Sequence, residues 1–174
     1  MNLSLISFKN SLLKQSLTDF DFSNPDIEPE LLEKSLVSLM LQCRGVGLAA
    51  NQVGYNKNVF AMGTEKCADA LFNPTIVEES EQKVVEMEGC LSFPGLFLEI
   101  ERPAGLIVEC YNSKGDKQNF ELVGFDARVF YHEYMHINGH VFLENVSKLK
   151  LERAIKKASK YGLKYQLSDF SHFF

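Results

Sequence analysis

The sequence lacks several features that mark specialised classes of protein. Its apolar runs fall far short of the roughly 18 residues that a membrane-spanning helix needs. Glycine and proline are sparse, with 11 Gly and 5 Pro in 174 residues, which excludes a collagenous or low-complexity chain. Its first residues lack the basic segment, apolar core and small-residue cleavage site of a signal peptide. We therefore expect a cytoplasmic protein without a membrane partner.

Cysteine is also scarce, and its four positions form no motif of their own. Cys43, Cys67, Cys90 and Cys110 are widely spaced and contain no C-x-x-C pair. This number and spacing exclude a disulfide scaffold and favour a reducing compartment. Any special role for a cysteine must therefore be found from the residues around it.

Neither sign of charge dominates, since 18 Lys and Arg face 23 Asp and Glu, a net charge of −5. That balance argues against a general or sequence-specific nucleic-acid binder, although a local basic patch can exist within an acidic average. The length suits one domain, and the 45% hydrophobic content is enough for a buried core. We expect a single domain that spans residues 1–174.

Hydrophobic periodicity divides the chain into a helix, a run of strands and two more helices. Residues 29–43 have the apolar spacing of an amphipathic helix. Between residues 58 and 120, short β-branched and aromatic runs broken by Gly, Pro and Asn are typical of antiparallel strands. Residues 125–137 return to a helical period, which Gly139 ends. This order predicts an α+β fold with antiparallel strands around a central helix.

The last predicted helix, residues 148–160, is strongly basic. Six basic residues and one Glu give it a net charge of +5, and Leu149, Ile155, Leu151 and Ala158 are expected to face inward. Four cations fall on one face of this helix: Lys150, Arg153, Lys157 and Lys160. Two interpretations stay open: an ordinary solvated helix face, or a docking surface for the polyanionic RNA of the ribosome.

The central helix contains His132-Glu133-Tyr134-Met135-His136, an H-E-x-x-H motif. This spacing places both imidazoles on one helix face, where they can bind one metal ion while Glu133 reaches the water beside it. Two His are an incomplete set, because a catalytic site of this kind usually has three protein ligands. The metzincin proteases use a third His, but Phe142 occupies that position here.

Cys90 is another candidate for the third ligand. It lies in Glu88-Gly89-Cys90-Leu91-Ser92, where a thiolate would serve as a soft ligand for a transition metal. A lone cysteine is more often a small buried apolar residue, so this motif alone does not decide between the two interpretations.

Three motifs together point to one family. They are G-x-G-L-A-A-x-Q over residues 45–52, E-G-C-L-S over residues 88–92 and H-E-x-x-H over residues 132–136. In this order and spacing they resemble the motifs of the peptide deformylases, over a stretch from about Leu36 to Phe142.

The resemblance implies a metal-dependent hydrolase that removes the formyl group from the N-terminal formyl-methionine of new polypeptides and releases formate. It implies one divalent metal ion held by Cys90, His132 and His136, with iron(II) favoured and zinc, nickel or cobalt able to substitute. Glu133 would be the general acid and base. The Gln52 side chain and the Leu91 backbone N–H would polarise the formyl oxygen.

The resemblance also indicates how the substrate lies. Its backbone would add as a strand, and its Met side chain would enter an apolar pocket. We expect the substrate-binding residues to be Val46, Gly47, Gly89 and Val129, together with Leu91. Plain core packing is the alternative for the apolar members of this group.

The sequence departs from the family pattern beside the metal motif. The usual form is Q-H-E-x-D-H, whereas Tyr131 and Met135 replace the Gln and the Asp here. Glu88 and Arg102 match a buried structural ion pair of the family.

Two other functions are kept as alternatives. One is an H-E-x-x-H metalloprotease. The other, suggested by Tyr131 and Met135, is a degenerate homologue that binds formylated chain ends or the ribosome without turnover.

Overall fold

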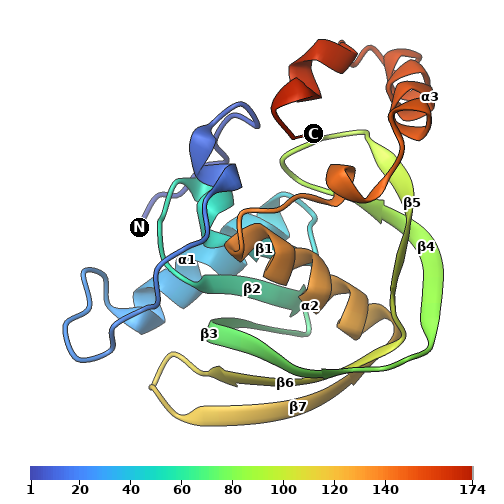
Figure 1. Cartoon of the computed structure of the whole chain (residues 1–174). Coiled ribbons are helices and arrows are strands. Elements are labelled where there is room, and N and C mark those ends of the chain that lie inside the picture. The colour runs from blue at the N-terminus through green and yellow to red at the C-terminus, as the bar shows by residue number, and fades with distance from the viewer. Residues whose placement is uncertain (174) are drawn as a thin grey trace.

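The computed structural model describes residues 1–173, within which three α-helices and seven strands form (Figure 1). The helices are α1 (Pro29–Gln42), α2 (Gly124–Ile137) and α3 (Lys148–Ser159). The strands are β1 (Gly47–Ala49), β2 (Val59–Thr64), β3 (Cys67–Glu79), β4 (Lys83–Gly89), β5 (Phe97–Pro103), β6 (Gly105–Tyr111) and β7 (Lys117–Val123). All three predicted helices are present, each with ends within one residue of the expected bounds.

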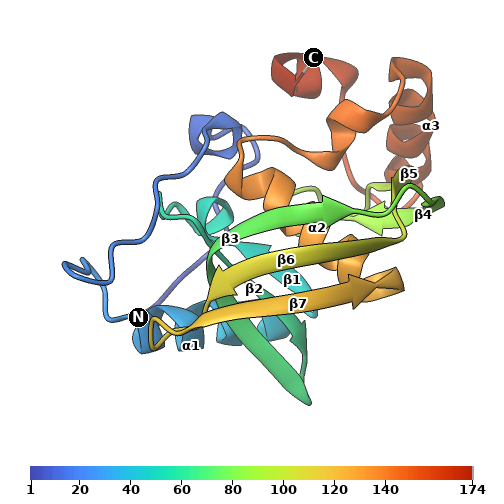
Figure 2. The ribbon, with the colours of Figure 1, turned by 60° about the horizontal axis from the view of Figure 1, so that its bottom comes forward.

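The strands form two antiparallel sheets. One has five strands in the order β1-β2-β3-β6-β7, and the other is the β4–β5 hairpin. Figure 1 shows α2 lying between the five-stranded sheet and this hairpin. Figure 2 shows β6 and β7 running beside β3, with α2 behind them. The predicted α+β class, with antiparallel strands around a central helix, is confirmed.

Helices α1 and α2 cover opposite faces of the five-stranded sheet. Successive residues of a strand point to opposite faces, so neighbouring residues of β2 pack against different helices. On β2, Val59 and Ala61 pack in a core cluster with α1, which contributes Leu32, Leu36 and Met40. Phe60, between them, packs in a second cluster with Phe130 of α2, at a ring-centroid distance of 5.1 Å. The short β1 strand was not predicted, and it anchors residues 45–52 at the edge of the sheet next to α2.

A third core cluster joins the hairpin to the C-terminal helix. Phe93, Leu98 and Ile100 pack against Leu151 of α3 and Phe170. The prediction that Leu149 faces inward is wrong, because this side chain is 56% exposed. Leu151 and Ala158 are buried as predicted, together with Ala154. The apolar residues of this helix allow more than one face to be buried. The face with Leu151 is buried because it packs against the β4–β5 hairpin.

Helix α2 ends at Ile137, and a left-handed glycine follows its cap residue. Asn138 caps the helix, Gly139 has φ +78°, and the N–H of His140 donates to the carbonyl of Met135 at 2.9 Å. These bonds satisfy the last carbonyls of the helix. A methyl group at Gly139 would lie 2.8 Å from the backbone of Lys14, so only glycine fits here. Among residues 1–173, no helix is long and apolar enough to cross a membrane.

Candidate metal centre and active site

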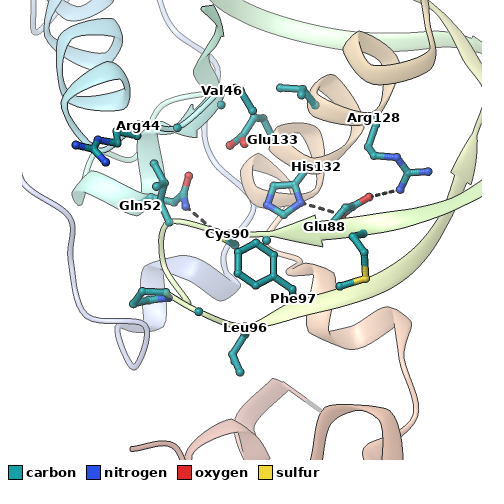
Figure 3. Close-up of a pocket in the computed structure, with 18 of the residues that line it drawn as sticks. Arg44, Val46, Gln52, Glu88, Cys90, Leu96, Phe97, Arg128, His132 and Glu133 are labelled. Atoms are coloured by element: carbon teal, nitrogen blue, oxygen red, sulfur yellow. Dashed lines mark hydrogen bonds and ion pairs between the residues drawn. The ribbon is translucent and has the colours of Figure 1, made fainter. Parts of the chain in front are cut away.

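A cavity of about 380 Å³ opens between β1, the β4–β5 hairpin and α2 (Figure 3). Three segments supply most of its wall: residues 44–47, residues 87–97 and residues 125–133. The three motifs are far apart in the sequence, and the fold brings them to this single cavity.

The three expected metal ligands lie together, and two of them, Cys90 and His132, line the cavity. Cys90 Sγ and the nearest ring nitrogens of His132 and His136 all lie within 4.8 Å of one another. Cys90 Sγ is 3.2 Å from His136 Nε2, and the two imidazole centroids are 5.2 Å apart. One thiolate and two imidazoles at this separation match the donor set and size of a transition-metal site. The residues therefore fit a single divalent ion.

A carboxylate orients one of these imidazoles. His132 Nδ1 lies 3.0 Å from Glu88 Oε2, as the dashed line in Figure 3 shows. Because a carboxylate accepts hydrogen bonds, Nδ1 carries the hydrogen and Nε2 is left for a metal. Burial raises the pKa of Glu88, but hydrogen bonds from His132 and Arg102 outweigh that effect and lower it to about 2. Glu88 is therefore ionised.

Burial and local charge set the state of the two imidazoles without metal. Burial lowers the pKa of His132, but hydrogen bonds with Cys90 and Glu88 raise it to about 10. Burial lowers the pKa of His136 well below its usual value, and the nearby His132 charge adds to this effect. His136 is therefore neutral and ready to bind, whereas a metal ion at His132 must displace a proton.

Glu133 lies beside the ligands and is almost fully enclosed, with 4% of its surface exposed. Burial raises the pKa of this carboxyl to about 7. Its Oε2 atom is buried and has no hydrogen-bond partner among the described residues 1–173. A methyl group on Gly47 would lie 2.3 Å from Glu133 Oε1, so the glycine of β1 makes room for this side chain.

The side-chain amide of Gln52 points into the site with a fixed orientation. The Ala49 N–H donates to its Oε1 at 2.8 Å, so its Nε2 faces the cavity. That nitrogen is 3.4 Å from Cys90 Sγ and 3.0 Å from Ser92 Oγ. The neighbouring backbone N–H of Leu91 donates to no acceptor within residues 1–173. Two donors therefore lie next to the metal ligands.

The expected substrate residues all line the cavity. Val46 is 37% exposed at its mouth, whereas Val129 is 7% exposed and one helical turn before His132. Gly47, Gly89 and Leu91 also line the wall. Sequence reasoning missed three exposed apolar residues around the opening: Met87, Phe97 and Phe125.

Arg128 is a further residue that sequence reasoning missed. It is 5% exposed, and its Nη1 donates to Glu88 Oε1 at 2.8 Å. It also bonds the backbone carbonyls of Val84 and Ile100, which ties α2 to both strands of the hairpin. Its position four residues before His132 was a usable signal, because that spacing places both side chains on one helix face.

Asn51 is the other missed residue, and it braces the end of α2. Its Nδ2 donates to the backbone carbonyl of His136 at 2.5 Å, and the side chain is fully buried. That carbonyl belongs to the last turn, where it also accepts from the Gly139 N–H at 3.1 Å. The motif of residues 45–52 is thereby bonded directly to the helix segment that carries the expected ligand His136.

Comparisons with known proteins agree with this site. The family model for polypeptide deformylase matches residues 3–152. A peptide deformylase from Rhizobium meliloti (strain 1021) is 35% identical over 161 residues, which cover 90% of this chain and 91% of the relative.

Solved structures give the same result. The crystal structure of peptide deformylase from Thermotoga maritima superimposes with a TM-score of 0.79 at 33% identity, covering 84% of this chain and 99% of that one. A peptide deformylase from Synechococcus elongatus in complex with actinonin has a TM-score of 0.82 at 30% identity, covering 95% of this chain and 88% of that one. The chain therefore belongs to the peptide deformylase family.

Proposed function

We propose that this enzyme hydrolyses the formyl group of N-terminal formyl-methionine on new polypeptides, with the site residues acting as follows. Cys90, His132 and His136 hold one divalent ion, which when bound would acidify a water molecule and polarise the formyl oxygen. Water adds to the formyl carbon, the carbon–nitrogen bond breaks, and formate and a free amino terminus result. The observation that carries the proposal is the grouping of Cys90, His132 and His136 within 4.8 Å of one another, beside a cavity that Glu133 and Gln52 line.

Glu133 moves the proton in this reaction. Its carboxylate accepts a proton from the attacking water and then gives it to the departing amine. The enclosed position of Glu133, next to His132 and free of a partner at Oε2, supports this role within the described chain. It is not a ligand in this proposal, so its removal should spare metal binding.

Gln52 and Leu91 stabilise the negative charge that develops on the formyl oxygen. The Gln52 Nε2 atom and the Leu91 N–H are donors fixed in place before the substrate arrives, which avoids a reorganisation cost. The bond from Ala49 to Gln52 Oε1 supports this role, because it prevents the amide from turning its oxygen inward.

The substrate occupies the cavity with its methionine side chain against Val129 and its backbone along residues 45–47 and 89–91. The apolar wall and the edge strand β1 support this placement, since an extended peptide can add to a free sheet edge. Gly47 and Gly89 line this path, and the space beside their α-carbons is taken by Glu133 and Phe97 respectively.

Iron(II) is the metal that we propose for the native enzyme, with zinc, nickel or cobalt able to replace it. A Cys and two His accommodate each of these ions, and availability in the cell decides among them. Metal analysis of protein purified without oxygen tests this choice. Recovery of zinc alone from such a preparation would refute iron(II).

Formate release is the direct test of the reaction. We expect formate from a formyl-Met peptide and no cleavage of the unformylated peptide of the same sequence. Peptide-bond cleavage of the unformylated peptide would support a metalloprotease instead. Binding of the formylated peptide without formate would support a degenerate homologue.

We also propose that α3 brings the enzyme to the ribosome, where formylated chain ends emerge, and hence that it works in the cytoplasm. The four cations of the predicted outer face are all exposed, and no described acidic group pairs with them. A polyanionic RNA surface attracts such a face even when the whole protein is acidic. We also propose that the chain forms a single domain over residues 1–174. The packing of Phe170 against Phe93, with ring centroids 6.1 Å apart, supports this within the described residues.

Cosedimentation with ribosomes across a salt series tests this docking. The test variant replaces Lys150, Arg153, Lys157 and Lys160 with Glu. The control makes an equal change of charge at four other exposed lysines, Lys34, Lys66, Lys83 and Lys114. We expect salt-sensitive binding that only the α3 variant loses, with activity on short peptides intact. Equal binding by both variants at low salt would refute docking through α3.

A further inference from the structure

Two side chains of α2 enclose the guanidinium of Arg102, on the side of the helix away from the substrate cavity. The Arg102 Cζ atom lies 4.9 Å from the centroid of the Tyr131 ring, over its face. Arg102 Nη1 lies 2.9 Å from Met135 Sδ. Tyr131 and Met135 are one turn apart on α2, so the helix presents both to the same group. Arg102 itself is 2% exposed.

The other nitrogens of Arg102 hold Glu88. Arg102 Nε donates to Glu88 Oε1 and Nη2 donates to Oε2, each at 3.0 Å, in a bidentate pair. Glu88 Oε2 in turn lies 3.0 Å from His132 Nδ1. An unbroken series of contacts therefore links Tyr131 and Met135 to the imidazole that we assign to the metal.

The two residues that surround Arg102 are uncharged. A methionine sulfur is only a weak hydrogen-bond acceptor. A tyrosine ring attracts a cation through its π face and forms no ion pair with it. Among residues 1–173, Glu88 is the only carboxylate in an ion pair with Arg102. Two nitrogens of the guanidinium therefore bond Glu88 while the third contacts Met135, and within the described residues no second carboxylate pairs with Arg102.

Tyr131 and Met135 also separate this buried ion pair from open space. A second cavity, of about 480 Å³, lies on that side of α2, and Arg102, Tyr131 and Met135 form part of its wall. Both α2 side chains are half-buried, whereas Arg102 and Glu88 are buried. Truncation of either would admit water to the guanidinium and weaken its hold on the carboxylate.

We propose that Tyr131 and Met135 are positioning residues for the metal site: they hold Arg102 on Glu88, and Glu88 keeps His132 Nε2 aimed at the ion. This inference rests on the proposed metal ligands. It assigns a role to the two positions at which the sequence departs from the family pattern. Groups that orient a metal-binding histidine typically change metal affinity by roughly 10–100-fold when they are removed.

The test measures how tightly the full-length chain holds Zn²⁺ against a chromophoric chelator. We expect Tyr131→Ala and Met135→Ala each to weaken Zn²⁺ binding about tenfold, the low end of that range, because each acts through Arg102 and Glu88. Tyr131→Phe keeps the ring over Arg102 and should keep wild-type affinity. Tyr134→Ala is the matched control, because it removes a half-buried tyrosine from the same helix without touching Arg102.

Wild-type Zn²⁺ affinity in both Tyr131→Ala and Met135→Ala would overturn the inference. An equal loss in Tyr134→Ala would also overturn it, since that result would mean general damage to the helix. Circular dichroism identifies a variant that fails to fold, and the other truncation then decides the matter. The proposed metal site fails separately if Cys90→Ser leaves the wild-type affinity unchanged.

Discussion

Replacement of Gly47 by alanine tests how closely the substrate site is built around Glu133. A methyl group at this position would lie 2.3 Å from Glu133 Oε1 and 2.7 Å from its Cδ. Ordinary contact begins near 3.4 Å, so the carboxylate must move by about 1 Å. Gly47 does not have a positive φ, so the backbone accepts alanine without strain and the effect is steric.

A displacement of about 1 Å at a catalytic group costs about 100-fold in rate, which corresponds to about 2.7 kcal/mol of activation free energy. We therefore expect Gly47→Ala to lower the rate constant of formate release by about two orders of magnitude while metal content and melting temperature stay unchanged. Gly105→Ala is the control, because a methyl group there meets its nearest atom at 3.3 Å, far from the site. Activity above half of wild type in Gly47→Ala would refute the steric argument.

Two other substitutions test the metal site and the core beneath it. Cys90→Ser should weaken metal binding, because a neutral hydroxyl is a poor replacement for a thiolate, and unchanged metal content in purified protein would remove Cys90 from the ligands. Phe93→Ala should lower the free energy of unfolding by about 3–5 kcal/mol, since Phe93 is fully buried and joins the hairpin to Phe142, Phe170 and Phe173. Phe125→Ala is its control in the same denaturant experiment: this ring is 58% exposed, and an equal loss of stability would contradict the assignment of the core.

Local patterns in the sequence were enough to predict the helices and the pairing of the two histidines. His132 and His136 are four residues apart, and a helix necessarily places such residues on one face. Cys90 could not be joined to them by spacing alone. Its assignment needed the resemblance of three separate motifs, and the 4.8 Å grouping of the ligand atoms now supports it.

The contacts that the sequence did not predict are those between distant segments. Arg128 bonds Glu88 across 40 residues of sequence, and Asn51 bonds the carbonyl of His136 across 85. The position of Arg128 places it on the helix face of His132, but nothing in the local pattern identifies Glu88 as its partner or His136 as the partner of Asn51. Strand β1 was missed because three residues are too few for an alternating pattern. Strand β7 extends to Val123, beyond the predicted limit at residue 120. The sequence did not show this end of the strand, because its residues are mostly exposed and their apolar and polar types alternate weakly.

The role of Gly47 shows a further limit of the sequence. A glycine beside a predicted ligand-binding segment suggests space for substrate, and Gly47 does line the cavity. The structure adds that the space beside its α-carbon is already filled by Glu133. Only the packing of β1 against α2 makes this visible.

The most direct test of the proposed mechanism is formate release by Glu133→Ala, measured together with its metal content. Glu133 is proposed to move protons without binding the ion, so we expect metal content equal to that of wild type and formate release below a few per cent of wild type, about the loss that follows removal of a general base. Formate release close to the wild-type rate in a metal-loaded Glu133→Ala protein would contradict the proposed mechanism.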